Sequence, residues 1–165
     1  MTVTSVVPDR DAQTLVLTAD YAAEPAAVWR LWSDPRLLER WWGPPAYPAA
    51  VDRHDLTPGG VVTYVMTGPD GQRFAGWWRV TAVDAPTSLA FDDGFGDVDA
   101  PADLPVTRTQ VSIADRGDGT TRMVLTSRFA SPEAFDQLIA MGMQEGLTEA
   151  VGQTDALLAQ AGSPA

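Results

Sequence analysis

Seven short segments of this chain carry apolar residues at every second position, and turns rich in glycine, proline and aspartate separate nearly all of them. A period of two is that of a β-strand with one buried face. Turns as tight as Gly68-Pro69-Asp70-Gly71 join antiparallel neighbours, because parallel strands need a crossover of a dozen or more residues. The sequence therefore predicts an antiparallel sheet. Its strands are expected at 14–21, 48–56, 61–67, 73–83, 88–92, 106–114 and 121–129.

Helical spacing of apolar residues occurs on both sides of the main strand region. Segments 25–33 and 35–41 each begin with a proline, which suits a first helical turn, and the prolines at 44 and 45 end the second segment. After the last strand, Ser131 is a good N-cap for a long amphipathic helix over 132–160. The sequence therefore predicts two short helices and one long C-terminal helix that covers a face of the sheet.

Three glycines interrupt this long helix at positions 142, 146 and 152. Each costs about 1 kcal/mol relative to alanine in a helix interior, so they call for a close approach or a bend. Thr154 stands where an apolar residue would be usual. The apolar stripe of the helix comprises Phe135, Leu138, Ile139, Met143, Leu147, Val151, Leu157 and Leu158.

Length and composition fit one α+β domain. A chain of 165 residues with 45% hydrophobic content can bury a single sizeable core. We assign residues 14–161 to this domain and expect residues 1–13 to form a loose N-terminal lead-in with at most some pairing at a sheet edge. Because the N-terminus has no basic stretch followed by an apolar run, and no apolar window of about eighteen residues occurs, we expect a cytoplasmic protein without membrane insertion.

The charge balance excludes several partners and chemistries. The chain has 22 acidic residues against 11 basic ones, all of them arginine, so we expect no nucleic-acid binding. Without cysteine there is no thiolate nucleophile or zinc–thiolate site, and without lysine there is no side-chain Schiff base. We expect no cofactor and no metal.

Five motifs resemble one protein family. The segment 32–44, Trp-Ser-Asp-Pro-Arg-Leu-Leu-Glu-Arg-Trp-Trp-Gly-Pro, resembles the signature of bacterial proteins similar to the C-terminal domain of the activator of the heat-shock protein 90 ATPase. Segments 55–60, 64–71 and 76–79 follow in the order that family shows, and 141–147 looks like a sub-branch of it. The resemblance spans about 14–160 and lies within the START and polyketide-cyclase superfamily, abbreviated SRPBCC.

This resemblance implies a helix-grip fold, here with a seven-stranded curved antiparallel sheet, two short helices and a long C-terminal helix. It also implies a cavity between sheet and helix, so our leading hypothesis is non-catalytic binding of a small hydrophobic or aromatic ligand. Core packing alone would explain any single large residue near such a cavity. The residues that we expect to line it are Trp42, Tyr64, Met66, Trp78, Phe91, Phe95, Arg108, Phe135, Met143 and Leu147.

Two other functions stay open. One is a polyketide cyclase-, dehydratase- or hydrolase-like enzyme that moves protons with His54, Asp55, Tyr64 or Arg108, although a structural or surface role explains the lone histidine better. The other is a co-chaperone-type interaction domain with an exposed apolar patch around Trp77; we do not expect a chaperone partner. Exposed edge strands would permit a homodimer.

The connection 93–105 is acidic and rich in glycine and proline. Its aspartates could attract a divalent cation, but they lack the alternating ligand pattern of a calcium loop. We therefore expect a solvated, mobile loop near the cavity.

Overall fold

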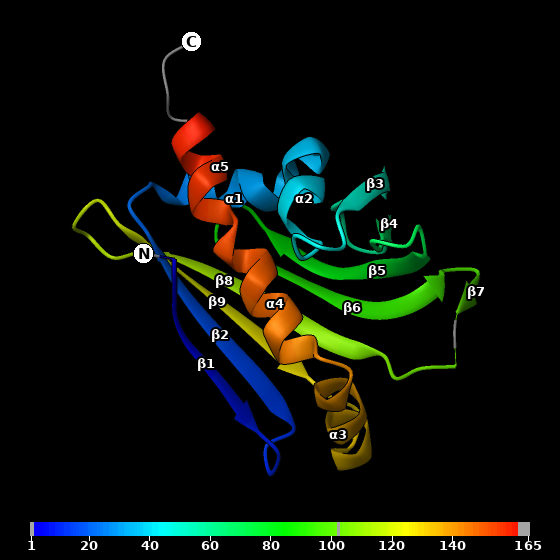
Figure 1. The fold of residues 1–165 in the computed structure, drawn as a ribbon. Coiled ribbons are helices and arrows are strands. Elements are labelled where there is room, and N and C mark those ends of the chain that lie inside the picture. Colours follow the sequence, from blue (N-terminus) through cyan, green and yellow to red (C-terminus); the bar gives the residue numbers. More distant parts are fainter. Residues whose placement is uncertain (1, 102, 162–165) are drawn as a thin grey trace.

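The computed structural model describes residues 2–101 and 103–161, which form a curved antiparallel sheet with helices on one side (Figure 1). The helices are α1 (Pro25–Ser33), α2 (Pro35–Trp41), α3 (Pro132–Ala140), α4 (Met143–Gly152) and α5 (Thr154–Ala161). The strands are β1 (Val3–Asp9), β2 (Thr14–Tyr21), β3 (Ala49–His54), β4 (Val61–Thr67), β5 (Arg73–Asp84), β6 (Ser88–Asp97), β7 (Ala100–Pro101), β8 (Thr107–Asp115) and β9 (Thr121–Arg128).

Eight strands follow one another in the order β1-β2-β9-β8-β6-β5-β4-β3, and the two-residue β7 pairs with β6 off this path. All of these pairings are antiparallel. In Figure 1, α3, α4 and α5 run one after another across a face of the sheet, while α1 and α2 lie at one end of it. Within the described ranges, none of the helices has both the length and the apolarity needed to cross a membrane.

The N-terminal segment corrects our expectation of a loose lead-in, because Val3–Asp9 pairs along β2. This strand lies at the edge of the sheet, and five of its seven side chains are exposed. Because so few side chains of this edge strand are buried, its sequence does not alternate between apolar and polar residues. The sequence pattern therefore did not indicate a strand here. The expected seven strands were therefore too few. Met1 lies outside the described residues.

Strand β6 is also longer than expected. It continues past 92 to Asp97, so the acidic segment is part of the sheet before it becomes a loop. Gly94 faces Trp77 across the sheet, and a Cβ on Gly94 would lie only 2.2 Å from the Trp77 ring. Glycine is poorly suited to strands in general, but here it makes room for the indole. Ala102 lies outside the described residues.

An aromatic core fills part of the space between sheet and helices. Trp78 of β5 stacks on Phe91 of β6 with ring centroids 4.0 Å apart. Trp32 of α1 packs edge-on against Trp41 at 4.8 Å, and Trp42 packs edge-on against Trp78 at the same separation. Such edge-to-face pairs add to the large area that each indole buries.

Helix α2 is fastened to strand β3. Asp34 caps the helix by accepting a hydrogen bond from the Arg36 backbone N–H at 2.9 Å. The Arg36 side chain donates to the Val51 carbonyl at 2.9 Å, and the Val51 N–H donates to Glu39 at 3.0 Å. These contacts fix the position of the Trp41-Trp42 pair at the C-terminal end of the helix.

The predicted C-terminal helix is three shorter helices, because its backbone turns at Gly142 and again at Gln153. Gly142 has φ of +89°, in the left-handed region that favours glycine. At the second break, the Thr154 hydroxyl donates to the Val151 carbonyl at 2.6 Å and so accepts from the buried Tyr21 hydroxyl at 2.9 Å. The polar residue that looked out of place in the sequence therefore joins α5 to β2.

We expect Gly142→Ala to lower the free energy of unfolding by about 1–2 kcal/mol, because a Cβ strains a left-handed residue. The matched control is Gly152→Ala, where φ is not positive and a Cβ would meet no atom within 4 Å. That change should be neutral or stabilising by up to about 1 kcal/mol. Urea unfolding of both variants measures the difference, and equal effects would contradict the assigned break.

Candidate functional site

A cavity of about 230 Å³ lies beside the aromatic core, between the inner face of the sheet and helices α3 and α4. Strands β4, β6, β8 and β9 form its floor and sides, and Trp42 and Pro44 close it from the loop after α2. Gly142 and Gly146 line it from the helical side. The cavity thus lies beside the break between α3 and α4 at Gly142, and beside Gly146, which has no side chain to fill it.

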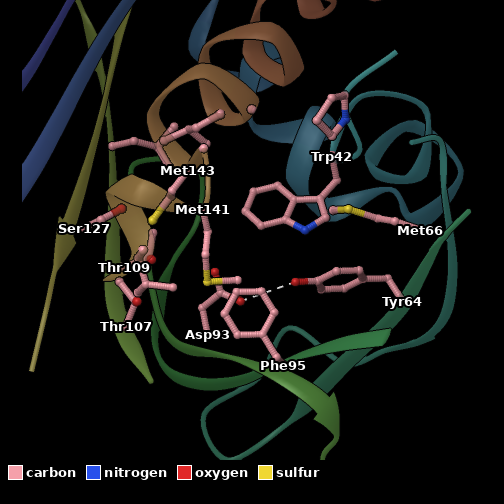
Figure 2. Close-up of a pocket in the computed structure, with 16 residues that line it drawn as sticks. Trp42, Tyr64, Met66, Asp93, Phe95, Thr107, Thr109, Ser127, Met141 and Met143 are labelled. Atoms are coloured by element: carbon pink, nitrogen blue, oxygen red, sulfur yellow. Dashed lines mark hydrogen bonds between the residues drawn. The ribbon is translucent and has the colours of Figure 1, made fainter. Parts of the chain in front are cut away.

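Six of the residues expected from the sequence line this cavity: Trp42, Tyr64, Met66, Phe95, Met143 and Leu147. Phe95 is 37% exposed and the neighbouring Met141 is 54% exposed, so this pair lies at the mouth (Figure 2). Three methionines, at 66, 141 and 143, contribute flexible side chains that can adapt to different shapes.

Four expected residues lie elsewhere. Trp78 and Phe91 are fully covered within the aromatic core. Phe135 packs edge-on against Phe129 in a separate small cluster under α3. Arg108 points to the opposite face of the sheet, where its side chain is 83% exposed and pairs with Asp92 at 3.7 Å. Strand β8 buries every second residue starting from Thr107, and Arg108 has the wrong parity to reach the cavity.

One wall of the cavity is a row of buried hydroxyls from Thr107 and Thr109 of β8 and Ser127 of β9. In the part of the chain that the structure describes, none of these three hydroxyls has a hydrogen-bond partner. In Figure 2 they lie across the cavity from Tyr64. Our sequence reasoning missed them, although the alternation in β8 places its threonines on the buried face.

Tyr64, on the far side of the cavity, forms a carboxyl–phenol pair with Asp93, which is the cross-strand partner of Thr107. The Tyr64 hydroxyl donates a hydrogen bond to Oδ1 of Asp93 at 3.3 Å, drawn as the dashed line in Figure 2. Tyr64 lies over Gly76, its cross-strand partner, and a Cβ on Gly76 would come within 2.4 Å of the tyrosine ring. The glycine therefore lets Tyr64 lie flat against the sheet and reach the carboxyl group.

Burial raises the pKa of the Asp93 carboxyl to about 7, although the hydrogen bond from Tyr64 acts in the opposite direction. Burial, and then the nearby Asp93 charge, raise the pKa of Tyr64 well above its usual value. Near neutral pH, the Tyr64 hydroxyl is thus protonated and donates a hydrogen bond, whereas the Asp93 carboxyl is partly protonated and partly ionised. Sequence reasoning placed Asp93 in a mobile loop and so missed this pair.

Two indole N–H groups near Tyr64 have no hydrogen-bond partner among the described residues, those of Trp42 and Trp78. Each of these N–H groups lowers the pKa of Tyr64 and so offsets part of the rise caused by burial. Neither N–H group, however, forms a hydrogen bond of normal geometry to the Tyr64 oxygen. Trp42 lines the cavity, and its indole nitrogen faces the side of Tyr64 and Asp93 in Figure 2. Buried donors without a partner are rare and costly, so the site offers an unused polar contact.

Other proposed catalytic groups lie outside the cavity. His54 contacts the Trp32 carbonyl through Nε2 at 2.9 Å, which ties β3 to α1. Asp55 accepts a hydrogen bond from the Thr57 hydroxyl within the following turn. With Arg108 on the other face, only Tyr64 of the four groups considered from the sequence lines the cavity.

The eight-stranded antiparallel sheet with C-terminal helices over a cavity is consistent with the helix-grip fold. Residues 22–159 match the family model described as activator of Hsp90 ATPase homolog 1-like protein. The chain belongs to this family, within the SRPBCC superfamily.

Solved structures agree with this assignment. The chain is 49% identical to protein Ms6760 from Mycobacterium smegmatis, with TM-score 0.86, covering 94% of this chain and 96% of that one. It is 45% identical to a protein from Arthrobacter aurescens, with TM-score 0.91 and coverage of 96% and 93%. The AHSA1 protein from Silicibacter pomeroyi is 27% identical, with TM-score 0.73 and coverage of 90% and 99%. No curated protein matches the chain.

The raised pKa of Asp93 predicts a specific dependence of stability on pH. Between about pH 4 and about pH 7 the unfolded chain loses this proton while the folded chain keeps it, so the free energy of unfolding falls as pH rises through this window. Asp93→Asn removes this fall in stability, because asparagine has no carboxyl group to ionise. Relative to wild type, the variant should gain about 2–4 kcal/mol between about pH 4 and about pH 8 in urea unfolding.

The control is Asp92→Asn, which changes the adjacent carboxylate on the opposite face of the sheet. Its stability should follow the wild-type pH profile through this window. Parallel profiles for Asp93→Asn and wild type would show that the Asp93 carboxyl has an ordinary pKa.

Proposed function

We propose that this chain binds a small, mainly apolar or aromatic molecule in the cavity, without chemically changing it. The observation that carries the proposal is the unfilled volume of about 230 Å³, which is lined mainly by buried and half-buried side chains and opens between Phe95 and Met141. Protein interiors pack densely, and voids larger than a water molecule are few. An apolar cavity of about 150 Å³ already accepts benzene, so this one has room for a substituted aromatic ring.

The composition of the walls supports a ligand with a mainly apolar body. Met66, Met143 and Leu147 offer adaptable apolar contacts, and Trp42 offers a ring face. The few polar groups are grouped at defined points, as in small-molecule sites where they fix orientation. Membership of the family establishes the fold, and the ligand hypothesis rests on this cavity.

An acid–base enzyme is the second candidate, because Asp93 combines a pKa of about 7 with a place in the cavity beside Tyr64. A general base works best when its pKa is near the working pH. The two candidates are separable: incubation of a bound molecule with the protein, followed by mass spectrometry, would reveal a chemically altered product only for the enzyme.

The interaction-domain alternative has less support. It expected an exposed apolar patch around Trp77, but this side chain is only 7% exposed and its indole donates to the Phe95 carbonyl at 3.1 Å.

We expect Gly146→Leu to abolish binding of the neutral probe 2-phenylethanol, because the new side chain would fill the cavity. A Cβ at this position meets only Pro44, at an ordinary 3.7 Å, so the helix can accept it. Calorimetric titration measures the loss, with wild type expected in the micromolar to millimolar range. Native mass spectrometry of the purified protein should likewise find less co-purified small molecule on the variant.

Gly152→Leu is the matched control, since it adds the same side chain to α4 at an exposed position that does not line the cavity. It should bind 2-phenylethanol like wild type. Binding that survives in Gly146→Leu, or that is absent from wild type and both variants, would count against the cavity as a ligand site.

A further inference from the structure

Among the residues that the structure describes, Asp93 is the sole carboxylate that lines the cavity, and no arginine lines it. The groups around the carboxyl are uncharged on every element that packs there: Tyr64 on β4, Trp78 on β5, Thr107 on β8, and Met141 and Met143 on the helical side. The Asp93 charge is therefore without a counter-charge in the described structure.

The neighbouring charged side chains lie on the other face of the sheet. Asp92 and Arg108 pair with each other there, and Arg79, which faces Asp92 across the sheet, is exposed. Because strand neighbours alternate between faces, none of the three can approach Asp93 without breaking the register of β5, β6 or β8.

One oxygen of the Asp93 carboxyl is still available. Oδ1 accepts the hydrogen bond from Tyr64, whereas Oδ2 makes none within the described part of the chain. A carboxylate can accept several hydrogen bonds but donates none when ionised. A ligand that displaces solvent from this side of the cavity replaces the lost hydrogen bond to Oδ2 when it brings a donor.

A protonated amine meets this requirement best. It supplies both the missing donor and the missing positive charge, and hydrogen bonds between charged groups are about twice as strong as neutral ones. The rings of Trp42, Tyr64 and Phe95 line the same space, and aromatic faces attract a cation as well. A carboxylate ligand would instead meet Asp93 with like charge and find no arginine.

We propose that the cavity is selective for a small apolar amine, whose ammonium group pairs with Asp93 while its aromatic or aliphatic body lies among the methionines and Leu147. This inference rests on the proposed binding function and names the ligand class. Asp93 is then the residue that determines specificity, and Tyr64 holds its carboxyl group in place through Oδ1.

Three probes of nearly equal size test the proposal: 2-phenylethylamine, 2-phenylethanol and phenylacetate. In calorimetric titrations at about pH 8, wild type should bind the amine at least about tenfold more tightly than the alcohol, and phenylacetate most weakly. Asp93→Asn should reduce the affinity for the amine to within about threefold of the alcohol, with the alcohol unchanged. Asp92→Asn should leave all three affinities as in wild type.

The pH profile provides an independent readout. The amine stays protonated from about pH 5.5 to about pH 8.5, while Asp93 becomes ionised within this range. Its affinity for wild type should therefore rise with pH and level off near the upper end, whereas the affinity for the alcohol should stay flat. In Asp93→Asn both profiles should be flat.

Two results would overturn the proposal, and they differ in meaning. If the alcohol binds and the amine binds no better, or if Asp93→Asn leaves the preference intact, the selectivity is refuted while the cavity remains a binding site. If none of the three probes binds to wild type that is folded by circular dichroism, the binding function fails as well. Removal of a buried charge should not prevent Asp93→Asn from folding.

Discussion

The edge-on contact between Trp42 and Trp78, at 4.8 Å, separates the solid core of this protein from its cavity. On one side of Trp42, the rings of Trp32, Trp78 and Phe91 fill the space over the sheet. On the other side the sheet and helices diverge around an unfilled volume. The position of Trp42 depends in turn on α2, which is fastened to β3 through Val51. The same contacts that stabilise the fold thus set one wall of the site.

The cavity exists because the C-terminal helical region cannot pack down fully at this point. Gly142 turns the chain between α3 and α4, and Gly146 presents no side chain toward Pro44. Gln153 donates to the carbonyl of Gly43 at 2.9 Å, so the far end of α4 is tied to the loop that carries Trp42 and Pro44. The C-terminal end of α4 is therefore fixed to this loop, and the cavity opens near Met141 and Phe95.

The chemistry of the site follows from strand parity. Adjacent residues of β6 point to opposite faces, so Asp92 pairs with Arg108 in solvent while Asp93 enters the cavity. Two carboxylates that are neighbours in the sequence consequently have opposite roles: one makes an exposed ion pair of small energetic value, and the other keeps an uncompensated group in an apolar setting. This contrast connects the pH dependence of stability to the expected selectivity for a cation.

The sequence by itself determined the local elements. Alternation and turns identified seven strands, which are β2 to β6, β8 and β9, and the prolines and caps located α1, α2 and the start of α3. The aromatic and methionine residues near the signature segments pointed to Trp42, Tyr64 and Met66 as cavity residues. The tertiary structure decided what depends on distant partners. Val3–Asp9 became a strand because β2 offered an unpaired edge, and Gly94 stayed in a strand because Trp77 covers it. Asp93 became a cavity residue because β6 continues along β5, and Phe91 became core because Trp78 stacks on it. Local sequence determines whether a segment favours a helix, a strand or a turn. Burial and strand pairing depend on residues far apart in the sequence, which meet only after the chain has folded.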